Sequence, residues 1–432
     1  MDVIRLGLAG FGTVGTGLAR ILDTNGERIA KRLGKRIEIR RVLVRDLTKQ
    51  RTFDPGTGVA FTTDPDVLVN DPDIDIVVEL MGGLDTAKAL MLKAFGAGKH
   101  VVTANKHLLA VDGLELFEAA SASGVGLMFE ASCAGGIPIV QTLKENLAGD
   151  EVVKMLGIVN GTANYILSEM TTKGMDFTIA LSEAQALGYA EADPTFDIEG
   201  FDTAHKLCVL IRMAFGVDYP LDELPVQGIT TVTPMDIEFA RRFGYRIKLL
   251  AHAMTSDGRL EAGVHPALVP YTYLLARVGG NYNAVRLEGN AVGPIMLHGQ
   301  GAGDLPTGSA VLADIMNLAR QTTGRCDILD NTGFRNQPIP RADIVPPGES
   351  ESKFYFRFTV ADRTGVMASI TRSMADHGVS IAQAVQDGEA GAKGVPLVII
   401  SHETRADAAQ AVVAEVDAMD FSVEPCVSFR IL

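Results

Sequence analysis

The chain has 432 residues, of which 47% are hydrophobic and 21% charged, as expected for a globular protein. Its length suggests about three domains. The net charge of −14 disfavours general binding to nucleic acid or to anionic membranes, and no apolar run is long enough to cross a bilayer. The N-terminus lacks a signal-peptide pattern, and the four cysteines form no CxxC pair. These features predict a cytoplasmic enzyme with reduced cysteines.

A glycine-rich loop follows the first predicted strand. Residues 3–9 form a short apolar run, and a helical pattern continues through residues 16–22. The loop between them reads Gly10-Phe11-Gly12-Thr13-Val14-Gly15. A strand, a loop of this form and a helix, in that order, are typical of a Rossmann-type dinucleotide-binding fold, in which the pyrophosphate lies at the helix N-terminus. The sequence therefore predicts a dinucleotide-binding domain over residues 1–130, with these six loop residues at the cofactor.

The end of the second predicted strand bears on the choice of cofactor. Residues 37–44 are followed by Arg45 and Asp46. A site selective for NAD usually has a carboxylate at this place for the ribose 2′-hydroxyl, whereas a 2′-phosphate needs a cation. Arg45 therefore indicates NADP, and Asp46 leaves NAD open.

Further strands are predicted at residues 74–80, 100–103 and 126–130. Ligands of such folds bind at the carboxyl ends of the parallel strands. Lys106 follows the second of these strands, so we expect it at the nicotinamide end of the cleft.

An acidic segment, residues 188–206, stands out in the middle of the chain. It contains Glu191, Asp193, Asp197, Glu199, Asp202 and Lys206. Its turn residues predict a loop that leads into a helix near Gly200, where Asp202 and Lys206 share one face. Carboxylates beside a lysine suit a small substrate with an amine and an oxygen that gains or loses a proton. The spacing alone fits a solvated turn with a helix ion pair equally well.

The later part of the chain contains a glycine-rich stretch with a helical pattern after it, a linker and a C-terminal region of alternating strands and helices. A glycine-rich stretch at 299–307 precedes a helical pattern at 309–320, and we expect residues 305–325 to return to the dinucleotide domain. Prolines mark a stiff linker at 338–352. Beyond it, residues 353–432 alternate in the order βαββαβ.

Several motifs in this order resemble homoserine dehydrogenase. They are the glycine loop, Thr103-Ala104-Asn105-Lys106, Glu130 with residues 134–138, Asn160-Gly161-Thr162, residues 188–206 and residues 301–307. The C-terminal segment resembles an ACT domain, although Thr364 stands where that fold commonly has proline. The resemblance implies an α/β protein with a Rossmann-type domain, an α/β catalytic and dimerisation domain with a mixed sheet at 131–304, and an ACT regulatory domain at 353–432.

The implied activity is the reversible NAD(P)-dependent interconversion of L-aspartate 4-semialdehyde and L-homoserine, a step in threonine, methionine and isoleucine biosynthesis. The resemblance also implies a monofunctional homodimer or homotetramer, with L-threonine as effector at the ACT domain. Two alternatives stay open. One is another NADP-dependent oxidoreductase of amino acids or semialdehydes, and the other is a non-catalytic nucleotide-binding amino-acid sensor.

The resemblance also implies residue roles. The substrate would be bound by Glu191 and Asp202, with Asp197 as a further candidate. Lys206 and Lys106 would be catalytic, and Gly188 and Gly303 would lie against the cofactor. A monovalent-cation site, for an ion such as Na⁺, would consist of Glu130 and the main-chain carbonyls of Cys133, Gly135 and Ile137. The position of Cys133 is commonly valine in the family, a change that a carbonyl ligand tolerates.

The two lysines are expected to differ in role. An efficient proton acceptor near neutrality must be able to lose its charge. The carboxylate of Asp202 favours the charged form of Lys206, which suits orienting the substrate and stabilising negative charge. Lys106 would lie beside the oxidised, positively charged nicotinamide ring. We therefore hypothesise that Lys106 exchanges the proton.

Overall fold

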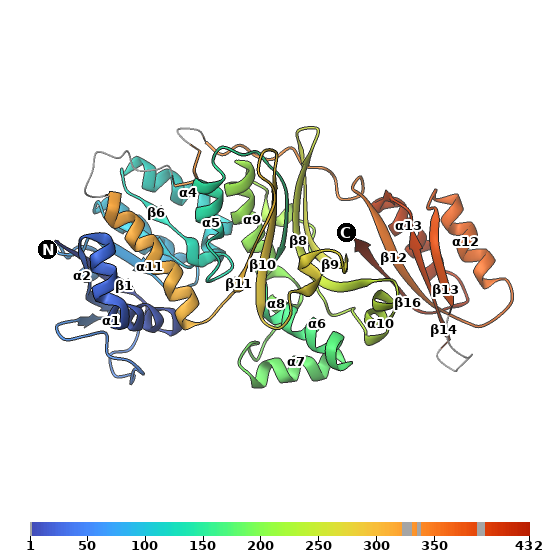
Figure 1. Ribbon diagram of the computed structural model, residues 1–432, viewed down its shortest axis with the longest axis horizontal. Coiled ribbons are helices and arrows are strands. Elements are labelled where there is room, and N and C mark those ends of the chain that lie inside the picture. Colours follow the sequence, from blue (N-terminus) through green and yellow to red (C-terminus); the bar gives the residue numbers. More distant parts are fainter. Residues whose placement is uncertain (1, 322–330, 335–337, 387–393) are drawn as a thin grey trace. The chain divides into compact units, whose positions relative to one another are not determined.

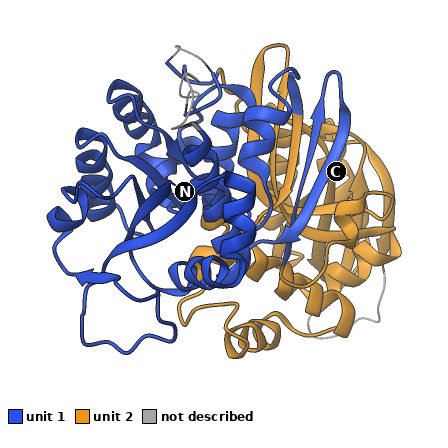
Figure 2. Ribbon diagram, turned by 60° about the vertical axis from the view of Figure 1, so that its left-hand side comes forward, with its two compact units in different colours: residues 1–153, 205–223, 282–342 blue, residues 154–204, 224–281, 343–432 orange. Residues whose placement is uncertain are grey.

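The computed structural model describes residues 2–321, 331–334, 338–386 and 394–432. The chain forms two compact units, each assembled from separate segments of the sequence (Figure 2). Unit 1 comprises Met1–Val153, His205–Glu223 and Tyr282–Ala342, and unit 2 comprises Lys154–Ala204, Leu224–Asn281 and Asp343–Leu432. Within the described residues, no helix combines the length and apolar character needed to span a bilayer.

Unit 1 is built on a six-stranded sheet with the order β3-β2-β1-β4-β5-β6, in which all neighbouring strands are parallel. Strands β1 and β6 of this sheet can be found in Figure 1. Its strands are β1 Val3–Ala9, β2 Arg36–Leu43, β3 Ala60–Thr62, β4 Ile76–Glu79, β5 His100–Thr103 and β6 Leu127–Met128. This is the Rossmann strand order, which reverses between β1 and β4. The predicted dinucleotide-binding fold is confirmed, and the reversal marks the expected place of the ligand.

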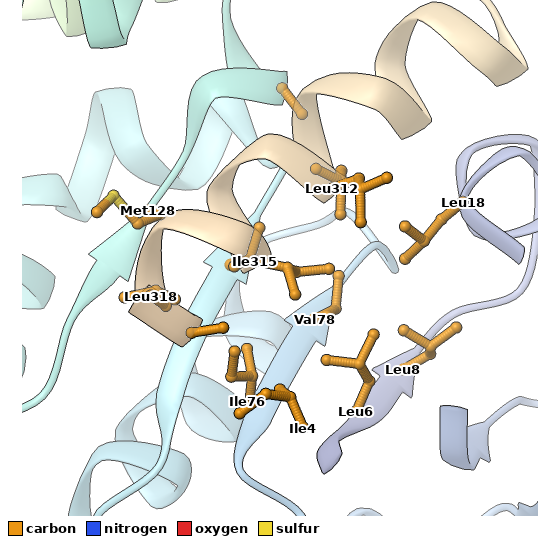
Figure 3. Close-up of a cluster of buried hydrophobic side chains, with 14 of the residues drawn as sticks. Ile4, Leu6, Leu8, Leu18, Ile76, Val78, Met128, Leu312, Ile315 and Leu318 are labelled. Atoms are coloured by element: carbon orange, nitrogen blue, oxygen red, sulfur yellow. The ribbon is translucent and has the colours of Figure 1, made fainter. Parts of the chain in front are cut away.

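Helices cover this sheet. They are α1 Thr13–Leu33, α2 Pro65–Val69, α3 Asp85–Gly96, α4 Lys106–Ala122 and, from far along the chain, α11 Asp304–Gln321. Figure 3 shows Leu312 and Ile315 of α11 in one buried cluster with Leu6 of β1. Glycines let α11 approach α1 closely, since a Cβ on Gly308 would lie 2.7 Å from the backbone nitrogen of Leu18. Helix α11 thus completes the core that the first strands of unit 1 begin.

The other described elements of unit 1 are helical segments and a hairpin. The helical segments are η1 Glu130–Ser132, α5 Ile139–Gln141, the π-helical η2 Thr142–Asn146, η3 Leu221–Glu223 and most of α9 Phe201–Phe215. Strands β10 Tyr282–Gly289 and β11 Gly293–Gln300 form an antiparallel hairpin. Because β11 ends at Gln300 and α11 begins at Asp304, only residues 301–303 of the glycine-rich stretch are a loop.

Unit 2 contains a mixed sheet, as predicted. Its strands run in the order β7 Val152–Ile158, β8 Tyr245–Ser256, β9 Arg259–Pro270, β16 Ser422–Ile431, β12 Glu351–Val360, β14 Val395–Ser401 and β13 Ile381–Gln386. The pair β9–β16 is parallel, whereas the other pairs of this run are antiparallel. Its helical segments before the C-terminal region are α6 Gly161–Lys173, α7 Phe177–Ala186, α8 Thr195–Ile198, α10 Pro234–Arg242 and η4 Leu274–Arg277.

The C-terminal region has the expected βαββαβ order. Its helices are α12 Val366–Asp376 and α13 Ala406–Asp417, and a short strand, β15 Thr404–Arg405, precedes α13. Their apolar faces pack with Phe356 and Phe358 of β12 in a separate buried cluster. The region also continues the sheet of the preceding segment, because Arg430 and Ile431 of β16 pair with Ala267 and Leu268 of β9.

A buried ion pair adds a side-chain link between α10 and β12. Asp236 is fully buried, and its carboxylate accepts hydrogen bonds from Arg357 Nε at 2.7 Å and from the Tyr355 hydroxyl at 2.9 Å. The same carboxylate completes the capping box of α10 with Thr233. Because a buried charge without a partner is costly, this network favours a fixed attachment of β12 to α10.

A buried lysine provides a test of the unit 2 core. Lys248 of β8 donates to Asn164 Oδ1 at 2.8 Å and to the Val278 carbonyl at 2.6 Å. Burial lowers the pKa of its amine to about 7. From about pH 7 to pH 10 the unfolded chain therefore holds a proton that the folded chain lacks, so the stability contributed here rises with pH.

Replacing Lys248 with methionine should reduce this pH dependence. We expect the free energy of unfolding of Lys248→Met to rise between pH 7 and pH 9 by roughly 2 kcal/mol less than that of the unmodified protein. Urea unfolding at the two pH values measures both slopes, and the other titrating groups cancel in the comparison. Equal slopes would show that Lys248 keeps its charge when folded.

Candidate functional site

The glycine loop joins β1 to α1 in unit 1 with the geometry of a pyrophosphate cradle. Gly10 has a φ of +104°, and a Cβ there would lie 2.7 Å from the Leu80 carbonyl. A Cβ on Gly15 would lie 2.9 Å from the Gly10 carbonyl oxygen. Gly12 caps α1, and among the described residues nothing lies within 4 Å of its would-be Cβ. Two glycines are thus needed for the turn, and the third leaves open space at the helix N-terminus for a phosphate.

The segment after β2 has an exposed cation, Arg45, and a hydrogen-bonded carboxylate, Asp46. Asp46 Oδ1 accepts hydrogen bonds from the Thr48 backbone N–H at 2.8 Å and from its hydroxyl at 2.7 Å. The hydroxyl and the N–H of Thr48 lower the pKa of this carboxyl. Arg45 is exposed, and no carboxylate among the described residues lies within ion-pair distance of it. The geometry therefore offers Arg45 to a ligand, while Asp46 is part of a turn.

The carboxyl ends of β4 and β5 are joined by hydrogen bonds. Glu79 is fully buried, and its Oε1 accepts from the Met81 N–H at 2.7 Å. Its Oε2 accepts from the Thr103 hydroxyl at 2.6 Å. Asn105 caps α4 and donates to the Gly83 carbonyl at 2.7 Å. This network places Lys106 as the first residue of α4, at the carboxyl edge of the sheet.

Neither Glu79 nor Asn105 was predicted to have a site role. Asn105 belongs to a recognised motif, and its place before a helix is a capping signal. Glu79 could have been found from its place inside an apolar strand, because a glutamate is rarely buried without a specific partner.

A second loop of unit 1, residues 130–137, lies against α9. Ala134 and Gly135 both have left-handed backbones, with φ of 55° and 54°. The thiol of Cys133 donates to the Lys206 carbonyl, with a sulfur–oxygen distance of 3.8 Å. Lys206 itself is 8% exposed. The loop predicted to bind a cation and the helix that carries Lys206 are therefore neighbours.

Glu130 in this loop is a buried carboxyl group. Its oxygens accept from the backbone N–H groups of Val140 at 2.9 Å and Gln141 at 2.7 Å, and its own N–H donates to Asp314 Oδ2. Burial raises the pKa of Glu130 to about 7, and burial together with the nearby Glu130 raises that of Asp314 well above its usual value. A bound cation would relieve the cost of two buried carboxyls.

Within the described parts of the chain, no three or more His, Cys, Asp and Glu side chains gather where they could hold a metal ion. A cation at Glu130 would therefore depend on main-chain carbonyls. Of the predicted carbonyl ligands, that of Ile137 accepts a hydrogen bond from the Ile139 N–H at 2.8 Å. The predicted cation site fits the chemistry of this loop and stays a prediction.

In unit 2, the acidic segment brings two of its carboxylates together. Asn160 Nδ2 donates to Asp197 Oδ1 at 2.7 Å and to Asp202 Oδ2 at 2.8 Å. The Asn160 side-chain oxygen accepts from the Ala163 N–H at 2.7 Å as the N-cap of α6. This cap fixes the orientation of the amide, so its donor faces both carboxylates. Two carboxylates held together attract a cation such as an ammonium group.

The other predicted residues of this segment have different contacts. Glu191 is exposed, and its backbone carbonyl accepts from Gln185 Nε2 at 3.0 Å. Gly188 has a φ of +75° and follows α7. Thr162 donates to the Tyr189 carbonyl at 2.7 Å, which attaches the segment to α6. Residues 195–198 form α8, where the sequence predicted a loop.

The predicted helix near Gly200 is confirmed as α9, which begins at Phe201. Asp202 and Lys206 lie one turn apart on it, and both are buried. Gly303 has a φ of +127° just before α11, whose Asp304 forms an ion pair with Arg20 of α1 at 3.1 Å. The role of Asn160 was missed, because only the folded chain shows which carboxylates it meets.

Comparison with known proteins gives a consistent result. The family model "Homoserine dehydrogenase, NAD binding domain" matches residues 10–130, and the model "Homoserine dehydrogenase" matches residues 138–316. Proteins named homoserine dehydrogenase from Neisseria gonorrhoeae and Pseudomonas aeruginosa are 41% and 40% identical to this chain. Each alignment covers 100% of this chain and 99% of the relative.

Solved structures show the same likeness. A crystal structure of a homoserine dehydrogenase from Thiobacillus denitrificans matches with a TM-score of 0.93 and 43% identity, covering 100% of this chain and 99% of that one. A hyperthermophilic archaeal homoserine dehydrogenase in complex with NADPH matches with a TM-score of 0.62 and 27% identity. That match covers 74% of this chain and 98% of the archaeal chain.

Proposed function

The chain belongs to the homoserine dehydrogenase family of NAD(P)-dependent oxidoreductases that act on a CH–OH group, and from that premise we propose which cofactor and residues it uses. The reaction interconverts L-homoserine and L-aspartate 4-semialdehyde, and bound NADP would supply or accept the hydride. The observation that carries the proposal is the buried pair Asp202 and Lys206, one turn apart on α9. A carboxylate beside a lysine suits a substrate that has an ammonium group and a reacting oxygen.

The proposed roles follow from charge. Asp202 binds the ammonium group, with Asp197 beside it and Glu191 at the exposed side of the segment. Lys206 orients the substrate and stabilises negative charge that develops on its oxygen. Lys106, at the carboxyl edge of the parallel sheet, takes the hydroxyl proton during oxidation and returns it during reduction.

A direct assay tests the activity. Purified protein should reduce NADP when L-homoserine is added, and should oxidise NADPH when the semialdehyde is added. Absence of turnover in both directions, with the nucleotide still bound, would favour a nucleotide-binding sensor. Turnover with other amino alcohols in preference to homoserine would favour a different oxidoreductase of this fold.

We propose that Arg45 selects NADP through its 2′-phosphate. The support is that Arg45 is exposed at the end of β2, whereas the carboxylate of Asp46 is held by Thr48. The loop Gly10-Phe11-Gly12-Thr13-Val14-Gly15 would hold the pyrophosphate, and Gly188 and Gly303 would lie against the cofactor.

Arg45→Glu should lower kcat/KM for NADP by about 10- to 100-fold, because a charge-assisted contact to phosphate is replaced by repulsion. The value for NAD should change much less. Arg36→Glu is the matched control, since it makes the same charge change at the opposite end of β2. Steady-state kinetics with both nucleotides measure the effect, and an equal loss for NADP and NAD would contradict the assignment.

We also propose a monovalent cation, such as Na⁺, held by Glu130 and the carbonyls of Cys133, Gly135 and Ile137. The burial of Glu130 beside Asp314 supports it, because two neighbouring carboxyls favour an added positive charge. The role would be structural, fixing the loop that contacts the Lys206 carbonyl.

The C-terminal region is proposed to be an ACT domain that binds L-threonine as feedback effector in a homodimer or homotetramer. The βαββαβ order supports the assignment. The alignment with the archaeal homoserine dehydrogenase covers 98% of that chain but 74% of this one, so part of this chain has no counterpart there. Titrating threonine into the activity assay, with sedimentation velocity on the same samples, tests both parts. Unchanged activity together with no measurable threonine binding would contradict regulation.

A further inference from the structure

Helices α4 and α9 of unit 1 each carry one of the two lysines proposed for the chemistry. Lys106 is the first residue of α4, and Lys206 lies in the second turn of α9. Each lysine has a histidine as its sequence neighbour. The rings of His107 and His205 stack, with 4.5 Å between their centroids and an angle of 19° between their planes. The two helices are therefore in contact directly beside both lysines.

A buried arginine forms a second contact between the same helices. Arg212 of α9 is 3% exposed. Its guanidinium donates to the carbonyl of Ala110 at 2.8 Å and to the carbonyl of Leu109, both in the first turns of α4. Its Nε donates to Asp218 Oδ1 at 2.6 Å, which balances the buried charge.

The α4 helix has a glycine where this guanidinium lies. A Cβ on Gly113 would lie 2.7 Å from Arg212 Nη1. Glycine is otherwise unfavourable in the middle of a helix, because it adds backbone freedom to the unfolded chain. The helix thus has a destabilising residue at a position where a Cβ would collide with the arginine.

We propose that Arg212 is a positioning residue that holds Lys106 and Lys206 at the spacing needed for hydride and proton transfer. The inference rests on the proposed roles of the two lysines. Arg212 fixes α4 within one turn of Lys106, and it lies six residues beyond Lys206 on α9. Together with the histidine stack, it prevents the helices from sliding or separating. Displacements of about 1 Å at reacting groups can cost about 100-fold in rate.

Gly113→Ala tests this without changing any charged group. The added methyl must displace the guanidinium, so we expect kcat for homoserine oxidation to fall about 10- to 100-fold. KM for NADP should stay unchanged, because the glycine loop is not touched. The limb of the pH–rate profile that is assigned to Lys106 should shift along the pH axis, because the surroundings of Lys106 change. If Arg212 only stabilises the fold, the molecules that remain folded should show that limb at its normal pH.

Gly26→Ala is the matched control. Gly26 also lies within a helix, α1, and among the described residues nothing lies within 4 Å of its would-be Cβ. It should keep the kcat and the pH–rate profile of the unmodified protein. Arg212→Lys gives a second variant that keeps the positive charge but loses the planar two-carbonyl contact, and it should show a smaller change in the same direction.

The outcomes separate this inference from the proposed function. Wild-type kcat and pH dependence per folded molecule in both Gly113→Ala and Arg212→Lys would overturn the positioning role. If Lys106→Ala and Lys206→Ala retain full activity, the proposed chemistry fails instead. Should Gly113→Ala not fold, the pH–rate profile of Arg212→Lys decides the matter alone.

Discussion

Lys106→Ala should lower kcat for homoserine oxidation by about 10²–10⁴-fold, the usual contribution of a positioned acid–base group. KM for homoserine should change little, because the substrate ammonium is assigned to Asp202. The large loss of kcat is expected because Lys106 has a fixed position at the N-terminus of α4. Asn105 caps this helix, and the Glu79–Thr103 hydrogen bond holds the preceding strands together. Steady-state kinetics at saturating NADP measure the effect.

Lys93→Ala provides a control for general loss of a lysine. Lys93 is an exposed residue of the neighbouring helix α3, where it pairs with Asp66. Its replacement should leave both kinetic constants unchanged. A raised KM with an unchanged kcat in Lys106→Ala would instead assign Lys106 to binding alone.

Asp202→Asn should raise KM for homoserine by about 30-fold or more, with a smaller effect on kcat. Removing one member of a buried ion pair typically costs about 2–5 kcal/mol, and the substrate ammonium would lose its buried counter-charge. The carboxylate of Asp202 is oriented by Asn160 at 2.8 Å, so the substrate meets a preformed partner. Initial rates over a range of homoserine concentrations give both constants.

Asp193→Asn is the matched control for that prediction. Asp193 lies in the same acidic segment but is exposed, and its side chain accepts from the Thr195 N–H at 3.1 Å. It should retain the normal KM. If Asp193→Asn and Asp202→Asn raise KM equally, the acidic segment acts through its overall charge rather than through a defined contact.

Local patterns were sufficient to predict the glycine loop and the start of α9. The glycine loop could be predicted because one stretch of sequence contains the strand end, the turn and the helix start. The start of α9 near Gly200 followed from turn residues and from the helical spacing of Asp202 and Lys206. In both places, residues that are adjacent in the sequence determine the local structure.

Contacts between distant segments could not be predicted in the same way. The pairing of β16 with β9 joins residues more than 150 positions apart, and no periodicity encodes it. The glycine-rich stretch at 299–307 hid the end of β11 and the start of α11, because glycine weakens both patterns. Asn160 and Arg212 show the same limit, since their partners become neighbours only on folding.

The pH dependence of kcat/KM in Lys106→Ala and Lys206→Ala, measured beside the unmodified protein, tests the central assignment most directly. Lys106→Ala should lose the limb that reports proton exchange. Lys206→Ala should keep that limb at a lower kcat/KM, because Lys206 orients the substrate and stabilises charge. Loss of the same limb in both variants, with equal severity, would contradict the division of roles between the two lysines.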